Sequence, residues 1–134
     1  MDTDFSFKKA ERISLRKEIE SLFENGKHFN EFPLHIIYCT DPEIKSAAVS
    51  ALISVPKKRF KKAVDRNRIK RLIRESYRLN KSPLVAKFKE NGNHLSLCFV
   101  YADSKIADMK VVNDAVCKVI DSLIQNIECF EKSE

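Results

Sequence analysis

The sequence has little glycine, no tryptophan and no paired cysteine motif. Only 2 Gly and 4 Pro occur among 134 residues, which excludes collagen-like and linker-like compositions. The four cysteines, Cys39, Cys98, Cys117 and Cys129, are separated by 59, 19 and 12 positions, and the three histidines are scattered. Because a structural zinc site needs closely spaced Cys and His ligands, we expect reduced thiols and no metal site.

Long hydrophobic runs are also absent. The longest, Leu97–Ala102, is far shorter than the roughly 20 residues of a membrane-spanning helix. The first residues, Met1–Asp4, are acidic and precede no apolar segment, so no secretory signal is expected. With 33% charged and 43% hydrophobic residues, the composition is typical of a cytoplasmic protein. We expect one domain over 1–134, with its core at about 7–127 and flexible ends.

Positive charge is concentrated in one segment. The stretch Lys57–Lys81 contains 12 Lys/Arg and 2 acidic residues, a net charge of +10. The rest of the chain, with 13 basic and 17 acidic residues, carries a net charge of −4. Such asymmetry is the pattern expected of a protein that binds a polyanion.

Hydrophobic periodicity predicts an α+β fold: a small mixed β-sheet packed with about three helices in a single two-layer domain. Ser82-Pro83 is expected to end the second helix, and Lys87–Asn93 is expected to form a loop. The expected order is helix Ser14–Lys27, strand Leu34–Thr40, strand Ala47–Val55, helix Ala63–Asn80, strand Leu95–Tyr101 and a helix around Val112–Ile127.

The basic helix is amphipathic. At about 100° per residue, the side expected to pack on the sheet carries Ile69, Leu72, Ile73, Ser76, Tyr77 and Leu79. The other side carries Asn67, Arg68, Lys70, Arg71, Arg74 and Arg78, with Arg66 near the edge of the apolar side. An ordinary solvated face is the alternative, but like charges repel along a helix and a phosphate backbone would relieve that repulsion. The residues therefore favour nucleic-acid binding, without deciding between DNA and RNA.

The stretch Lys57–Glu75 has a basic lead-in (Lys57–Lys62), then Ala-Val, an Arg-Asn-Arg triplet and further Lys/Arg residues ending in Arg-Glu. This pattern resembles the signature of the bacterial ribonuclease P protein subunit. The resemblance extends from about Phe7 to Ile127. It implies a left-handed crossover that joins two parallel strands through the basic helix.

The resemblance also implies a function. The family assists a catalytic RNA that uses Mg²⁺ to hydrolyse the phosphodiester bond at the 5′ leader of precursor tRNA. The expected partners are this RNA and precursor tRNA, with no obligate protein partner and no membrane. The chain would then be the accessory subunit of an endoribonuclease, with no catalytic side chain and no metal site of its own.

Two groups of site residues follow from the resemblance. The residues expected to bind RNA are Lys57, Lys58, Arg59, Lys61, Lys62, Arg66, Asn67, Arg68, Lys70, Arg71 and Arg74. Phe23, Ile36 and Tyr38 are expected to line a cleft for the leader, although apolar residues of this kind are more often core. Alternation along the strand places Leu34, Ile36 and Tyr38 on one face and His35, Ile37 and Cys39 on the other.

Two other functions are alternatives. A general structured-RNA-binding protein, such as a ribosome-associated one, has a similar composition. A stand-alone metal-dependent nuclease needs clustered carboxylates or histidines, whereas the acidic residues here are dispersed. Phe60, within the lead-in, is expected either to pack in the core or to stack on RNA.

Overall fold

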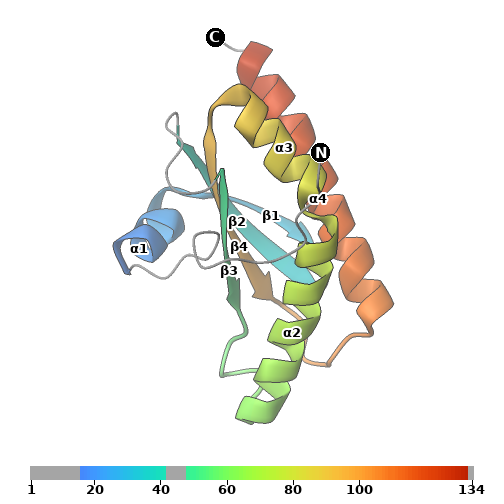
Figure 1. The fold of residues 1–134 in the computed structure, drawn as a ribbon. Helices are drawn as coiled ribbons and strands as arrows, with labels where there is room; N and C mark the ends of the chain where they lie inside the picture. The colour runs from blue at the N-terminus through green and yellow to red at the C-terminus, as the bar shows by residue number, and fades with distance from the viewer. Residues whose placement is uncertain (1–15, 42–47, 133–134) are drawn as a thin grey trace.

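The computed structural model describes residues 16–41 and 48–132, in which four helices and four strands occur (Figure 1). In chain order they are α1 (Arg16–Asn25), β1 (Lys27–Glu31), β2 (Leu34–Asp41), β3 (Val49–Ser54), α2 (Ala63–Asn80), α3 (Ser82–Asn91), β4 (His94–Tyr101) and α4 (Met109–Lys132). None of these helices has the length and hydrophobicity needed to cross a bilayer.

The strands form one mixed sheet with the order β1-β2-β4-β3. β2 pairs antiparallel with both β1 and β4, while β3 and β4 are parallel. The basic helix α2, followed by α3, connects this parallel pair. The predicted α+β class and the mixed sheet are therefore confirmed.

Helices cover the two faces of the sheet unequally. α2, α3 and α4 lie on one side of the sheet and α1 lies on the other (Figure 1). The main core, beneath the three helices, contains Ile36 and Phe99 from the sheet and Val116 from α4. A much smaller cluster, in which Leu22 of α1 packs on Ile37 and Cys98, lies on the second face. We call this second face the α1-side face.

Two elements were not expected from the sequence. β1 is short and polar, and three of its five residues are exposed, so it lacks the alternation that marks a strand. The predicted loop at Lys87–Asn93 is wrong, because most of it belongs to α3. Pro83 lies in the first turn of α3, where its missing N–H is not needed. α3 ends at Gly92, which adopts a left-handed φ of 72°.

The remaining bounds agree to within a few residues. α2 spans the predicted Ala63–Asn80, and β3 is slightly shorter than the predicted strand. Ser14, the expected start of the first helix, lies outside the described residues.

Candidate nucleic-acid interface

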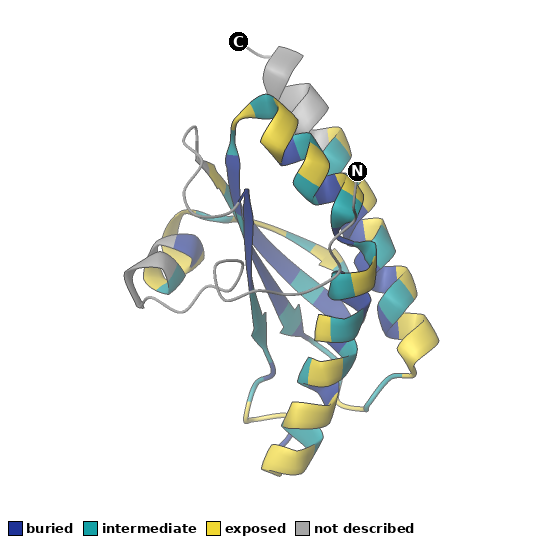
Figure 2. Ribbon diagram, in the orientation of Figure 1, coloured by how far each residue is buried: buried dark blue, intermediate teal, exposed yellow. Residues whose placement is uncertain are grey.

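The first turns of α2 extend beyond the sheet. Ile69 is the first buried residue of this helix, whereas Val64, Asn67 and Arg68 are exposed. Figure 1 shows these turns at the lower end of the molecule, and Figure 2 shows exposed residues on them. The N-terminal part of α2 is therefore open to a partner from several directions.

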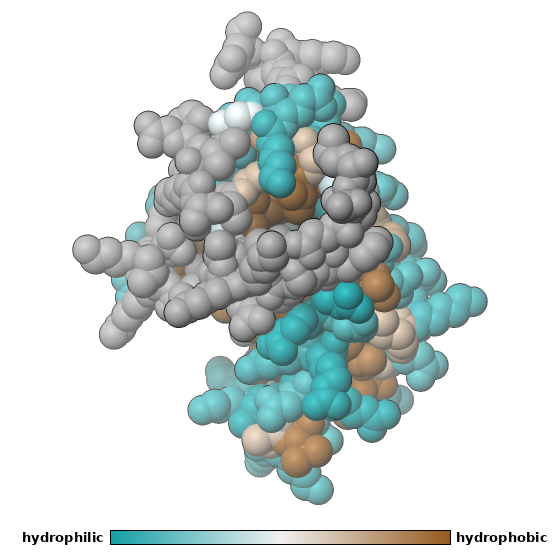
Figure 3. All heavy atoms as spheres, viewed as in Figure 1, coloured by the Kyte–Doolittle hydropathy of each residue, from teal (hydrophilic) through white to brown (hydrophobic). Residues whose placement is uncertain are grey.

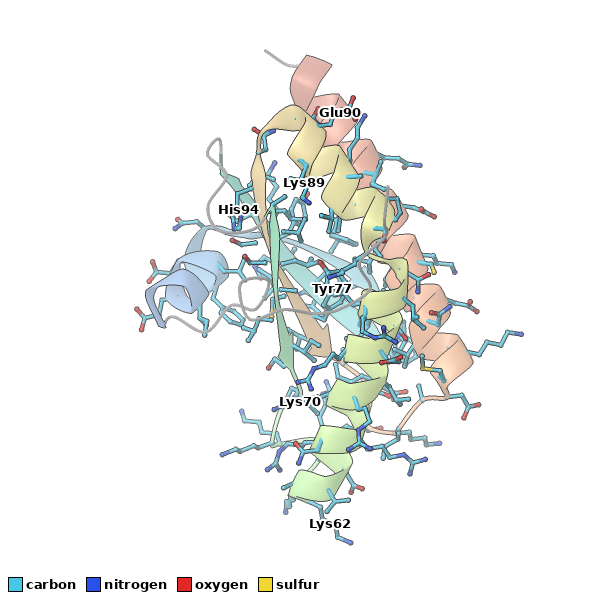
Figure 4. The ribbon with its side chains drawn as sticks, viewed as in Figure 1. Lys62, Lys70, Tyr77, Lys89, Glu90 and His94 are labelled. Atoms are coloured by element: carbon cyan, nitrogen blue, oxygen red, sulfur yellow. The ribbon has the colours of Figure 1, made fainter. Side chains whose placement is uncertain are left out.

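Cationic side chains surround this part of α2. Figure 4 shows Lys62 and Lys70 on its lower half, and the surface there is mostly hydrophilic in Figure 3, with a hydrophobic spot at its lower end. Within the described ranges, no carboxylate pairs with the exposed cations of this surface. We define the basic surface as the exposed Lys57, Lys58, Arg59, Lys61, Lys62, Asn67, Arg68, Arg71 and Arg74 with the half-buried Arg66 and Lys70.

The acidic residue Glu75 does not neutralise the basic surface. Arg78, three residues later on α2, donates to Glu75 through both Nε and Nη2. This hydrogen bonding lowers the pKa of Glu75 and raises that of Arg78. The negative charge of Glu75 is thus matched within the pair, and the other arginines keep their full charge.

The start of α2 adds to the positive potential. Lys62 occupies the N-cap position, and no side chain caps the free N–H groups of the first turn. Asp65 is the acidic residue of that turn. Because the helix dipole is positive at this end, nearby cations are unfavourable there and an anion is favourable. A phosphate bound at the N-terminus of α2 would therefore stabilise this end of the helix more than the neighbouring residues do.

Arg66 holds the lead-in in place. Its Nη1 donates to the backbone carbonyl oxygens of Phe60 and Lys61, both at 2.8 Å. Phe60 is buried, and its ring centroid lies 5.8 Å from that of Tyr101. Phe60 therefore packs in the core, and Arg66 ties the turn before α2 to the helix.

The opposite side of α2 faces the core largely as predicted. Ile69, Ile73, Ser76 and Tyr77 are buried, and Leu72 is partly buried. The prediction for Leu79 is wrong, because this side chain is 45% exposed.

The three residues predicted to line a leader cleft do not share one surface. Ile36 and Tyr38 are 0% and 8% exposed and belong to the main core. Phe23, by contrast, is 44% exposed on α1, which covers the other face of the sheet. The strand alternation was predicted correctly, but α1 packs over Ile37 rather than over Ile36 and Tyr38. The prediction that Ile36 and Tyr38 line a cleft is therefore wrong.

The α1-side face instead carries a polar row that α1 leaves partly open. Strand register places Ser54, Val100, His35 and Asn30 side by side across β3, β4, β2 and β1. All four are half-buried or exposed. The row begins at Ser54, three residues before Lys57, so one end of it lies near the lead-in in the chain.

A pair of histidines on this face was missed in the sequence. His28 Nδ1 lies 3.0 Å from His35 Nε2, and His35 Nδ1 lies 2.5 Å from Asn30 Oδ1. The feature of the sequence that could have revealed this pair is the short turn at Phe32-Pro33. A hairpin centred on that turn pairs Asn30 with His35. Without that turn the histidines are merely seven positions apart.

The thiols and carboxylates form no catalytic group in the described ranges. Burial raises the pKa of the Cys98 thiol to about 12, which makes it unreactive at neutral pH. Burial also raises the pKa of Cys117, and Asp121 and Asp114 nearby reinforce the effect. Across these ranges, no group of three or more His, Cys, Asp or Glu could hold a metal ion.

Comparison with known proteins identifies the family of the chain. The family model for ribonuclease P matches residues 7–128. A ribonuclease P protein component of Porphyromonas gingivalis is 39% identical over 123 residues, covering 92% of this chain and 90% of the relative. A ribonuclease P protein component of Chlorobium phaeobacteroides is 36% identical over 104 residues, covering 72% and 71%.

Solved structures share the fold. The Staphylococcus aureus RNase P protein superposes with a TM-score of 0.68 at 24% identity, covering 84% of this chain and 94% of that one. The RNase P protein from Thermotoga maritima gives a TM-score of 0.64 at 20% identity, covering 84% and 96%. With a family model that spans most of the chain and relatives of this similarity, the chain belongs to the ribonuclease P protein family.

Proposed function

We propose that the chain binds the catalytic RNA of ribonuclease P through the basic surface. The observation that supports this most strongly is the set of exposed cations at the free end of α2 that no described carboxylate matches. Arginine suits this role because its planar group donates two hydrogen bonds to one phosphate. A helix that meets RNA in this way recognises a folded backbone mainly by its shape and charge.

The second contact is with the 5′ leader of precursor tRNA. The polar row on the α1-side face offers hydrogen-bonding groups at Ser54, Asn30 and His35 beside the apolar Val100. Phe23 on α1 exposes an aromatic ring on which a base can stack. A single-stranded leader lying on this face would run between α1 and the lead-in.

The chemistry belongs to the RNA. Removal of the leader requires attack of water on a phosphodiester and stabilisation of the charged transition state, for which bound Mg²⁺ is suited. The described residues hold no cluster of carboxylates that could bind such ions. We propose that the protein contributes binding and orientation, and that the RNA subunit holds Mg²⁺.

Reconstitution tests this function. The protein, the cognate catalytic RNA and precursor tRNA are combined at low magnesium, and leader release is measured with each component omitted in turn. We expect cleavage only when the RNA is present, and faster cleavage when the protein is added. Cleavage by the protein alone would instead identify a protein nuclease.

The leader contact has its own test. In the presence of the catalytic RNA, the protein should increase the affinity for precursor tRNA more than that for mature tRNA. Phe23→Ala should reduce this difference. Val111→Ala is the matched control, because Val111 is also 44% exposed but belongs to α4, on the opposite side of the sheet (Figure 1). Equal affinity for both tRNAs would favour a general structured-RNA-binding protein.

A further inference from the structure

A hydrogen-bonded chain of three side chains crosses the β1–β2 hairpin. It runs from His28 through His35 to Asn30, with separations of 3.0 Å and 2.5 Å. The imidazole ring centroids are 5.2 Å apart and the rings are tilted by 37°. Because His28 pairs with Ile37 and Asn30 with His35, all three side chains share the α1-side face.

Asn30 fixes the tautomer of the His35 ring. The amide oxygen of Asn30 can only accept, so Nδ1 of His35 carries the hydrogen. In the neutral ring, Nε2 of His35 then carries a lone pair, which accepts a hydrogen bond from Nδ1 of His28. Histidines that bind metals are oriented in this way, with the far nitrogen bonded to a carbonyl or carboxylate oxygen.

The nitrogen separation fits two bonds to one ion. Two metal–nitrogen bonds of about 2.1 Å at a right angle place the nitrogens about 3.0 Å apart, and the observed separation is 3.0 Å. A tetrahedral ion would need about 3.3 Å. The pair therefore suits ions that accept right angles between ligands, such as Ni²⁺ and Cu²⁺.

We propose that His28 Nδ1 and His35 Nε2 form a binding site for a divalent transition-metal ion. His35 keeps its Nδ1–H on Asn30. His28 moves its proton from Nδ1 to Nε2 through water, which breaks the hydrogen bond between the two rings. The rings then turn slightly, so that the lone pairs of both ligand nitrogens point at the ion.

The site is open on its outer side. His28 is exposed and His35 is half-buried, and the described residues provide no third His, Cys, Asp or Glu to complete the group. The remaining coordination positions are taken by water or by an oxygen ligand such as a phosphate. The site does not suit Mg²⁺, because this ion prefers oxygen ligands to nitrogen ligands.

Titration of the full chain with Ni²⁺, without RNA, tests the site. Imidazole nitrogen resonances are followed by NMR, since paramagnetic Ni²⁺ broadens the groups that bind it. We expect His28 and His35 to broaden first and the buried His94 to remain sharp, with no change in an equal titration with Mg²⁺. Broadening of His94 together with the pair, or no broadening of the pair at millimolar Ni²⁺, would overturn the proposal.

Variants of single residues show which side chains bind the ion. His28→Gln should weaken Ni²⁺ binding at least tenfold, and Asn30→Ala should weaken it about tenfold by releasing His35. Cys39→Ser is the control, because Cys39 is a thiol outside any disulfide on the same face, and its loss should leave Ni²⁺ affinity unchanged. If Cys39→Ser abolished binding and His28→Gln did not, the site would be a thiolate and not the histidine pair.

Discussion

Removing two arginines from the exposed side of α2 should change how RNA binding depends on salt. Arg68 and Arg71 are both exposed on the basic surface. If this surface neutralises about six phosphates, log Kd against log salt concentration has a slope of about 4 to 5 in magnitude, and each lost contact removes about 0.7–0.9. The double variant Arg68→Ala/Arg71→Ala should therefore retain a slope of about 3.

The difference is large enough to measure. Between 50 and 200 mM salt, the affinity of the unmodified chain should fall about 500-fold, and that of the double variant about 60-fold. The assay is fluorescence anisotropy with labelled catalytic RNA at several salt concentrations. Neither substitution should change the fold, because both side chains lie outside the core.

A control with the same loss of charge isolates the basic surface. Lys89→Ala/Lys118→Ala also removes two exposed cations, but from α3 and α4. Lys89 lies at the opposite end of the helical layer from Lys62 (Figure 4). This variant should keep the unmodified slope. Equal slopes for all three proteins, or a shallow slope of about 1 for the unmodified chain, would refute the reasoning.

Three further predictions concern stability, each measured by urea unfolding. Arg66→Ala should lower the free energy of unfolding by about 1–2 kcal/mol, because two charge-assisted bonds to the lead-in are lost; no loss would mean that the lead-in holds its position without them. Gly26→Ala should cost about 3 kcal/mol, since a Cβ there would lie 2.3 Å from the Leu22 carbonyl oxygen. Gly92→Ala, which meets no atom but keeps φ at +72°, should cost only about 1 kcal/mol, and equal costs would contradict the clash. Above pH 9, stability should fall by up to about 1.4 kcal/mol per pH unit, because the unfolded Cys98 thiol ionises while the folded one, with its pKa raised to about 12, stays protonated. Cys98→Ala should remove this part of the pH dependence, and an unchanged slope would show that other groups cause it.

The sequence predicted well the elements whose pattern depends on local burial. The long helix α2 has a strong 3.6-residue period and was placed at its observed bounds. β1 could not be predicted in this way, because it is stabilised by pairing with β2 rather than by burial of its own side chains. α3 was missed for a different reason: Lys81 ends one helix and begins the next, so Ser82-Pro83 marks a start as well as a stop.

The basic surface could be predicted from the sequence because it is defined by charge, whereas the leader cleft could not because it depends on packing. Exposure of Arg68, Arg71 and Arg74 followed from their position opposite the apolar side of α2. The leader cleft failed because β2 is apolar on both faces, with Ile36 and Tyr38 on one and Ile37 on the other. Local sequence does not say which of two apolar faces a ten-residue helix will cover, since that depends on where the larger helices pack.

The size of α1 explains why this helix leaves part of the α1-side face uncovered. A helix of 10 residues is about 15 Å long and about 10 Å wide. Four strands span about 14 Å between the outer two, and an eight-residue strand is about 26 Å long. Such a helix covers only about half of this area, and it contacts the middle of the sheet at Ile37 and Cys98. The part that α1 does not cover has polar side chains at Asn30, His35 and Ser54. We expect a ligand bound there to gain hydrogen bonds without displacing an apolar core.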